Sequence, residues 1–373
     1  MFEVPAAAAE AASGPAAEQD PAPHPGHEPS PAQPVQHRRA ASGVLAAETD
    51  AAVHTLARAL PAGLHLGTSS WHFPGWASLV WGGDYAPAKL SKQGLTAYAQ
   101  HPLLRSVSLD RAFYRPLSAS QYAHYAAQVP PHFRFVVKAP ALVCDALVRA
   151  QDGRGMAPNP AFLNNDLAIQ EFIQPALDGL GLRVGALVFQ ISPLPRALLA
   201  DVPALIERIG ALLAALPPLA PAAPDGVIAL EVRDATFLSP PHAPLLARAL
   251  RAARQASGNP VTYCLGLHAK MPPIEDQLPL LRALWPGPLV CRWNLHRRHG
   301  AYGYEDAKAQ YEPFDKLVDP DLETRQHLAR VIAGTTGAGQ RAYITINNKA
   351  EGSAPLSVAA LAEAVVQHAS PSP

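Results

Sequence analysis

The chain has 373 residues, and its 30 lysines and arginines balance its 30 aspartates and glutamates, so it has no global field to hold nucleic acid or an anionic membrane. Its cysteines, Cys144, Cys264 and Cys291, show no CxxC spacing, which fits a reducing cytosol and argues against a cysteine-based zinc site. No apolar run reaches the ~18 residues that span a bilayer, and the N-terminus lacks a signal-peptide pattern, so we expect a cytoplasmic protein without a membrane partner.

Residues 1–45 are dominated by Ala, Pro, Glu, Gln and His and follow neither a strand nor a helix period. Such a segment buries too little apolar surface to offset its ordering entropy, so the composition predicts a disordered tail. A short helix from about Thr49 to Leu60 is expected next, within a lead-in segment over residues 46–62. The folded domain is expected over residues 63–370.

From residue 63 onward, short β-rich runs alternate with stretches of helical period. Eight such units in succession predict a closed (β/α)8 barrel, a TIM-barrel-like α/β fold in a single domain. The predicted strands are Leu64–Thr68, Arg105–Leu109, Arg134–Lys138, Gly185–Gln190, Val227–Val232, Val261–Gly266, Leu289–Trp293 and Ala342–Asn347. The predicted helices are Lys89–Gln100, Ser120–Gln128, Asn165–Asp178, Val202–Leu216, Ala243–Ala256, Ile274–Leu284, Leu322–Ile332 and Leu356–His368.

Local signals support several helix starts. Ser120 can cap its helix, Asp319-Pro320 precedes another start, and Ser353-Ala354-Pro355 places a capping hydroxyl before a proline that pre-sets the helical dihedral. Long loops follow the first, third and seventh strands. Because loops longer than ~15 residues are uncommon unless functional, they point to the C-terminal face, where barrel active sites lie.

Six ordered motifs carry a family resemblance. They are GTSSWHFPGW at Gly67–Trp76, AFYRPLS at Ala112–Ser118, FRFVVKAP at Phe133–Pro140, LVFQISPLP at Leu187–Pro195, ALEVRDATF at Ala229–Phe237 and ITINNKAEGSAP at Ile344–Pro355. In this order they resemble the YecE-like proteins, domain of unknown function 72, over residues 63–368. The resemblance implies a TIM-barrel-like fold and leaves the activity open, because no enzymatic activity is firmly assigned to that family.

The chain departs from the family at the second strand. Where the family usually shows a Val-Glu-hydrophobic-Asn pattern, this chain has Val107-Ser108-Leu109-Asp110. If the family's acidic residue takes part in chemistry, Ser108 cannot replace it. Asp110, two positions on and therefore on the same side of the strand, could partly stand in.

Two carboxylates are candidates for acid–base chemistry. Asp110 and Glu231 end the second and fifth strands, and a barrel can bring such groups together across its mouth. A metal held by both and by His268 is conceivable, but the histidines form no HExxH signature, so no metal ligand is predicted and the cofactor is left open. The structural alternative is an ion pair between Glu231 and Arg233. The cost of burying a charge after an apolar strand favours a function for Glu231.

Other polar side chains end neighbouring strands. Lys138 ends the third strand, where burial could tune it for acid–base or Schiff-base chemistry or make it an anion clamp, unless it simply reaches solvent. Gln190 ends the fourth and would orient a ligand. Trp71 could stack on a sugar or base, or the tryptophans of its loop could cap the barrel. Ser70 has no nucleophile-elbow context, so a serine hydrolase is not expected.

The leading hypothesis is an enzyme acting on a small phosphorylated or otherwise anionic, sugar-like ligand. Barrels commonly bind phosphate with the loops after strands seven and eight and a helix N-terminus, so Arg292 and the amides of residues 352–353 would form an anion clamp. The predicted catalytic groups are Glu231, Lys138 and Asp110. The predicted ligand-binding residues are Ser70, Trp71, Tyr114, Gln190, Arg233, Arg292, Asn347, Asn348, Lys349, Gly352 and Ser353.

Two alternatives remain open. The loop from Arg297 to Tyr304 interleaves positive charge with aromatic rings, as a nucleic-acid-binding or phosphodiester-processing barrel would require, although nearby acidic residues could simply balance it. A non-catalytic scaffold is the third reading, favoured if Trp71, Tyr114 and Trp293 fill the mouth of the barrel. The oligomeric state is left open.

Overall fold

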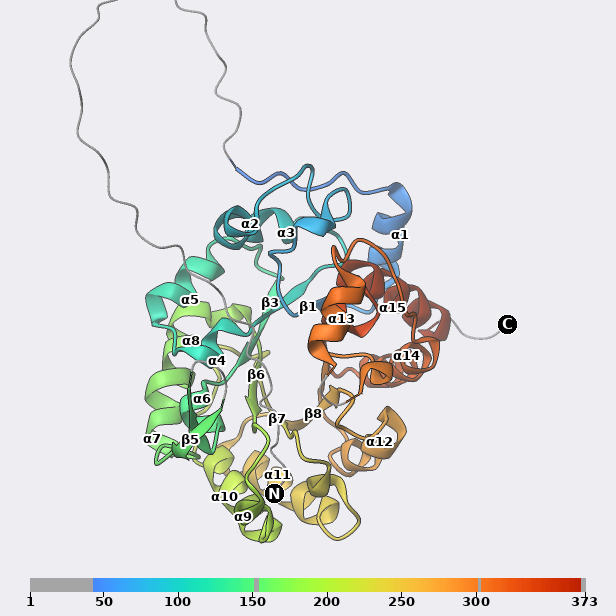
Figure 1. Ribbon diagram of the computed structural model, residues 1–373. Helices are drawn as coiled ribbons and strands as arrows, with labels where there is room; N and C mark the ends of the chain where they lie inside the picture. The colour runs from blue at the N-terminus through green and yellow to red at the C-terminus, as the bar shows by residue number, and fades with distance from the viewer. Residues whose placement is uncertain (1–42, 151–153, 301–302, 370–373) are drawn as a thin grey trace, which may run out of the picture.

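The computed structural model describes residues 43–150, 154–300 and 303–369. Its centre is a closed barrel of parallel strands in the order β1-β10-β9-β8-β7-β6-β3-β2 (Figure 1). The barrel strands are β1 (Leu64–Thr68), β2 (Ser106–Leu109), β3 (Arg134–Lys138), β6 (Val184–Gln190), β7 (Val227–Glu231), β8 (Val261–Leu267), β9 (Leu289–Trp293) and β10 (Ala342–Ile346). The predicted TIM-barrel-like fold is confirmed, and each predicted strand lies within one residue of its observed bounds.

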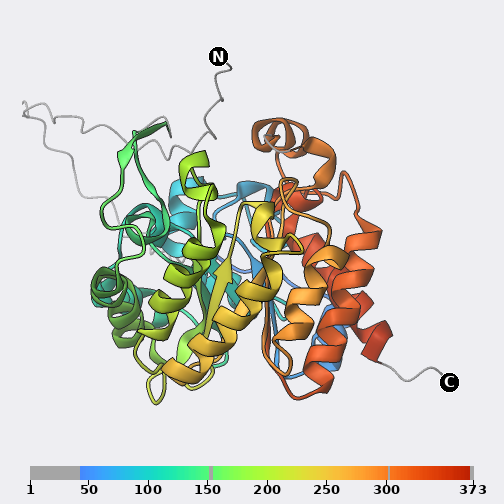
Figure 2. The same cartoon turned by 90° about the horizontal axis from the view of Figure 1, so that it is seen from below.

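Helices surround the barrel and run alongside its strands (Figure 2). The α-helices are α1 (Ala51–Ala59), α2 (Pro87–Gln93), α3 (Leu95–Tyr98), α4 (Arg111–Tyr114), α5 (Ala119–Ala126), α6 (Ala141–Cys144), α7 (Asn165–Ala168), α8 (Gln174–Leu180), α9 (Arg196–Leu199), α10 (Val202–Ala214), α11 (Ala243–Ser257), α12 (Ile274–Ala283), α13 (Tyr304–Tyr311), α14 (Leu322–Gly337) and α15 (Ala354–Ala369). The short 3-10 helices are η1 (Pro74–Trp76), η3 (Gly181–Arg183), η4 (Ala235–Leu238), η5 (Arg297–His299) and η6 (Asn348–Ala350), and η2 (Ile169–Ile173) is a π-helical turn. None of the helices in the described ranges is long and apolar enough to cross a membrane.

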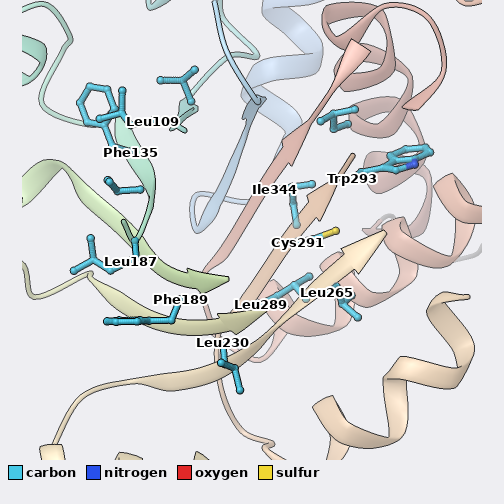
Figure 3. Close-up of a cluster of buried hydrophobic side chains, with 14 of the residues drawn as sticks. Leu109, Phe135, Leu187, Phe189, Leu230, Leu265, Leu289, Cys291, Trp293 and Ile344 are labelled. Carbon is cyan, nitrogen blue, oxygen red and sulfur yellow. The ribbon is translucent and has the colours of Figure 1, made fainter. Parts of the chain in front are cut away.

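Alternate residues of each strand face opposite sides, so the barrel has two apolar layers. The inner layer is a separate buried cluster of small or slender side chains around one aromatic ring: Val136, Ala186, Val188, Val227, Ala229, Cys264, Val290 and Tyr343. The outer layer packs against the helices and includes the side chains labelled in Figure 3, among them Leu109, Phe189, Leu230 and Trp293. Inner positions near the carboxyl ends of the strands are therefore the ones that can reach the mouth of the barrel.

The opposite end of the interior is closed by His65 and Tyr343. Their rings stack with centroids 5.1 Å apart. Burial, reinforced by nearby arginines such as Arg134, lowers the pKa of His65 to about 3, so the ring is neutral at ordinary pH. The neutral rings thus separate the interior of the barrel from the arginines at this end.

Two of the predicted helices are broken. Asn165–Asp178 contains α7, the π-helical turn η2 and α8 rather than one continuous helix. Lys89–Gln100 is divided into α2 and α3 at Gly94, where a Cβ would lie 2.5 Å from the carbonyl oxygen of Leu90. A helical period in the sequence does not distinguish a regular helix from one with a local change of winding.

Two predicted helix caps are wrong in their residue. Ser118, not Ser120, caps α5, and it forms a capping box with Gln121. At α15, Asn348 Oδ1 accepts a hydrogen bond from the Ala354 amide at 2.8 Å, and the buried Ser353 hydroxyl has no hydrogen-bond partner. Asn348, six residues before Ala354, therefore caps the helix in place of Ser353.

The loops that follow β1, β3 and β9 contain short elements of their own. A two-stranded antiparallel sheet of β4 (Leu147–Arg149) and β5 (Gly155–Pro158) follows β3, and α13 follows β9. Residues 1–42 of the predicted tail lie outside the described ranges. Immediately after them, Ala46 forms an antiparallel bridge with Trp81 in the loop that follows β1.

Candidate functional site

Polar side chains replace the apolar inner layer where the barrel strands end. Lys138, Gln190 and Glu231 are the last residues of β3, β6 and β7, and Arg292 lies next to the last residue of β9. Each is two positions beyond an inner-layer residue, so each lies on the inner side of its strand. On the neighbouring strand β8, Gly266 lies beside Glu231, and a Cβ at this position would be 3.5 Å from the Glu231 side chain, in ordinary van der Waals contact.

Arg292 connects three other strands of the barrel. Its Nη1 donates to Gln190 Oε1 at 2.9 Å and to Glu231 Oε2 at 2.8 Å, and its Nη2 donates to both carboxylate oxygens of Asp110 at 3.0 and 2.8 Å. Only 2% of the Arg292 side chain is exposed. Burial alone would lower the pKa of its guanidinium, but the two carboxylates overcome that effect and raise it.

Glu231 is held by a second arginine as well. Arg233 Nε lies 2.7 Å from Glu231 Oε1, as the structural alternative predicted, and Arg233 Nη2 donates to Gln190 Oε1 at 2.9 Å. Burial would raise the pKa of Glu231, but Arg233 and Arg292 together lower it. Glu231 therefore stays ionised and is poorly suited to donate a proton.

Asp110 is the outer member of this network. Its side chain is 37% exposed, and the hydroxyl of Ser108 donates to Asp110 Oδ1 at 2.7 Å. Ser108 thus orients the carboxylate two positions away onto Arg292. Because the guanidinium lies between Asp110 and Glu231, it occupies the place where a metal shared by these carboxylates would have to bind.

Lys138 differs from the other cations because no carboxylate binds it directly in the contacts that the structure shows. Its Nζ lies 3.4 Å from the ring centroid of Phe113. Burial, followed by the charge of Arg292, lowers its pKa from 10.5 to about 7, although Asp110 opposes the shift. The network thus contains an amine that can exchange a proton near neutral pH.

Lys349 joins the network through Tyr304, which the sequence analysis had placed in a nucleic-acid-binding loop and not at this site. Tyr304 on α13 accepts a hydrogen bond from Arg233, and Lys349 Nζ lies 5.2 Å from the Tyr304 ring centroid. The ring of His268 lies 5.2 Å from the same tyrosine, and burial together with Arg233 lowers the pKa of His268 to about 3. The predicted residues Lys349 and Arg233 are therefore brought together by Tyr304.

The rest of the eighth loop has a structural role. Asn347 Oδ1 accepts from the Lys349 amide at 2.9 Å, and Asn348 Oδ1 accepts from Trp76 Nε1 at 3.2 Å as well as from the start of α15. The Gly352 amide donates to the Asn348 carbonyl at 2.7 Å, and Ser353 is fully buried. The prediction that the amides of 352–353 form an anion clamp is wrong for Gly352, because its amide already donates a hydrogen bond within the loop.

Other predicted residues are aromatic, and Tyr114 packs edge-on against Phe113, which borders the network. Trp71 is 6% exposed and packs edge-on against Tyr125 of α5, whereas Tyr114 is 63% exposed. Trp293 belongs to the outer layer (Figure 3). These three rings therefore do not fill the mouth together, as the scaffold reading required. Trp71 offers a ligand little open ring face.

Ser70 has a neighbour that the sequence analysis did not use. Its Oγ lies 2.7 Å from His72 Nδ1, so a histidine two residues on contacts the hydroxyl. The spacing Ser-x-His was visible in the sequence, but only the turn after β1 shows that the two side chains meet.

The basic loop after β9 is largely occupied by internal contacts. Arg297 Nη1 donates to the Met271 carbonyl at 2.6 Å, and Arg298 forms an ion pair with Asp319. His299 Nε2 lies 2.7 Å from the Tyr311 hydroxyl. Tyr302 lies outside the described residues. These contacts reduce the positive charge that the loop can offer to a nucleic-acid backbone.

Fold and site define a (β/α)8-barrel protein whose C-terminal mouth is lined by a buried network of ionisable side chains. The chain belongs to the family described as protein of unknown function DUF72, whose model matches residues 65–373. A comparison with curated proteins finds no match.

Solved structures of DUF72 family proteins are among those similar to this chain. A family member from Enterococcus faecalis is 16% identical, covers 81% of this chain and 95% of its own, and superposes with a TM-score of 0.54. Another from Thermotoga maritima is 17% identical, covers 82% of this chain and 97% of its own, and has a TM-score of 0.44. At these identities the likeness concerns the fold alone.

Proposed function

We propose that this protein is an enzyme that acts on a small anionic, sugar-like ligand at the C-terminal mouth of the barrel, with Lys138 as its acid–base group. The observation that carries the proposal is the network of Asp110, Lys138, Glu231, Arg233 and Arg292, in which the Glu231–Arg292 pair is fully buried and Asp110 reaches solvent. Buried ion pairs contribute little net stability because desolvation offsets their attraction. Strongly shifted pKa values in a barrel mouth are typical of functional sites.

Charge favours an anionic ligand. The carboxylates of Asp110 and Glu231 face the cations of Arg233, Arg292 and Lys349, so cations outnumber carboxylates before Lys138 is counted. A site with excess positive charge and little exposure to water attracts anions strongly, because the low local dielectric screens the charge less than water does.

The partly exposed carboxylate of Asp110 occupies the position on Arg292 that the ligand's acid group takes when the ligand binds. It is the outermost partner of Arg292, and both of its oxygens contact the same Nη2. A phosphate or carboxylate from the ligand takes over this N–H group and displaces Asp110 toward solvent. Arg292 then binds the anion without leaving Glu231 or Gln190, which hold its Nη1.

Lys138 supplies the proton transfer. A general acid or base works best when its pKa lies near the working pH, and the pKa of Lys138 is about 7. The pKa of Glu231 is lowered by two arginines, which leaves this carboxylate to orient Arg292 rather than to exchange protons. Gln190 fixes both arginines through its Oε1.

Calorimetric titration with inorganic phosphate tests the anion site. We expect Lys349→Met to weaken phosphate binding, and Asp110→Asn to strengthen it because a competing carboxylate is removed. The matched control is Lys89→Met, since Lys89 also lies over a tyrosine ring, 4.9 Å from that of Tyr85. Unchanged affinity in both site variants would overturn the anion site.

The same preparation distinguishes the nucleic-acid alternative. Binding of a single-stranded oligonucleotide that weakens steeply with salt would favour that reading, because each contacted phosphate releases counterions. Phosphate binding without oligonucleotide binding at low salt supports the small ligand. The internal contacts of Arg297 and Arg298 make the second result the expected one.

A further inference from the structure

A second group of ionisable side chains lies outside the barrel, between α12 and α14. These helices are neighbours on the outer surface (Figure 1). Glu275 comes from α12, and Glu323 and His327 come from α14. One carboxylate or imidazole atom of each residue lies within 4.8 Å of the others, so the three side chains converge on one point.

The positions of these residues on their helices explain why the three side chains converge. Glu323 and His327 are four residues apart on α14, and side chains with that separation lie on the same helical face. Glu275 is the second residue of α12, so it extends from the end of that helix toward α14. Two rigid elements therefore fix all three groups, rather than a loop.

The group lacks the counter-charge that accompanies other convergent carboxylates in this protein. Glu231 and Glu351 each lie against arginine, but within the described ranges no lysine or arginine pairs with Glu275 or Glu323. Like charges held this close repel each other unless a cation lies between them. The cluster thus concentrates negative charge where only His327 is available to offset it.

His327 is held in a ligand-like position. Its Nδ1 contacts Glu275 Oε1, yet this nitrogen is inaccessible to water and makes no hydrogen bond of normal geometry. The side chain as a whole is 25% exposed. An imidazole nitrogen and a carboxylate oxygen are both ligand atoms for transition metals, and here the two face each other.

We propose that Glu275, Glu323 and His327 form a divalent transition-metal site that links α12 to α14. Imidazole and carboxylate ligands suit Zn²⁺, whereas Mg²⁺ and Ca²⁺ prefer oxygen ligands alone. Three protein ligands leave one position of a tetrahedral zinc ion for water. Because the ion bridges two helices, its main effect is to stabilise this side of the barrel, independently of the chemistry proposed at the mouth.

Calorimetry and thermal unfolding of the untagged full-length chain with ZnCl₂ test this site. We expect zinc to raise the melting temperature and MgCl₂ to have no effect, since a ligand that binds only the folded state stabilises it. Glu323→Gln and His327→Gln should each weaken zinc binding at this site by at least about tenfold. Loss of an outer-shell partner alone weakens metal binding by roughly that factor, and these two residues are proposed as direct ligands.

Zinc could also bind histidines elsewhere in the chain, so matched controls are required. Glu171→Gln and His124→Gln change exposed helical residues away from the cluster and should leave zinc binding as it is in the parent. Cobalt absorption in the parent and its loss in His327→Gln would show that the imidazole binds the ion. Equal zinc affinity in the parent and in both cluster variants would overturn the proposal, as would a parent that binds no zinc.

Discussion

The lowered pKa of Lys138 is the property on which the proposed chemistry depends most. At pH 7 about half of the Lys138 side chains are neutral, whereas an ordinary lysine with a pKa of 10.5 has about one neutral amine in three thousand. Burial beneath Phe113 and the charge of Arg292 lower the pKa, and Asp110 raises it. Together these effects predict that the Lys138 amine titrates near pH 7 and that its pKa changes when Arg292 or Asp110 is replaced.

Asp110→Asn is the perturbation that separates these contributions. It removes a charge that favours the ammonium, so the pKa of Lys138 should fall below its parent value of about 7. Asp110 is partly exposed, so the substitution should leave the fold intact. Asp225→Asn is the matched control, because Asp225 also pairs with arginine but lies next to the first residues of β7, at the opposite end of the barrel.

The assay is heteronuclear NMR titration of the lysine side chains, with the Lys138 signal assigned from its loss in Lys138→Met. A midpoint near pH 7 in the parent and in Asp225→Asn, and a lower one in Asp110→Asn, would support the reasoning. A midpoint near 10 in the parent would refute it. It would mean that water reaches Lys138 more freely than the packing of Phe113 allows.

Three further predictions concern stability. Lys138→Met should remove a pH dependence of the free energy of unfolding. Between about pH 7 and 10.5 the unfolded chain holds a proton that the folded chain has lost, so the free energy of unfolding of the parent rises by about 1.4 kcal/mol per pH unit. Equal slopes in urea unfolding of parent and variant would contradict this. Ser118→Ala should cost about 1 kcal/mol by loss of the capping box, and Ser120→Ala clearly less, as measured by chemical denaturation. Arg325→Met should cost about 3–5 kcal/mol, because it leaves the fully buried Glu351 carboxylate without its cation, and a loss below 1 kcal/mol would show that this pair is not needed.

The strands could be predicted from the sequence because both of their faces are buried. A parallel strand such as Val184–Gln190 is apolar along its whole length and ends in a polar residue, which gives a sharp boundary. The same polar ends located Lys138, Glu231 and Arg292 at the mouth. Their position follows from strand direction alone, so no knowledge of partners was needed.

The partners themselves could not be predicted. Arg292 and Asp110 are 182 positions apart, and their contact depends on how the barrel closes rather than on any local pattern. The same holds for Asn348, which looked like a ligand-binding amide but is held by Trp76 and the start of α15. A polar residue in a loop gives no indication in the sequence of whether the chain's own backbone or a ligand will bind it.

The metal-ligand cluster also depended on the structure. Glu323 and His327 have helical spacing that is common on exposed helices and carries no signal by itself. Only the packing of α12 against α14 brings Glu275 to them. Because the three proposed ligands come from two separate helices, they form no recognisable motif in the sequence.

A crystal structure of the protein with inorganic phosphate tests the central claim most directly. We predict phosphate density at the C-terminal mouth, within hydrogen-bonding distance of Arg292 Nη2, with Asp110 displaced from the guanidinium and Lys138 facing the bound ion. Phosphate bound elsewhere, with the Asp110–Arg292 pair unchanged, would contradict the account and would make the buried network a structural feature of the barrel.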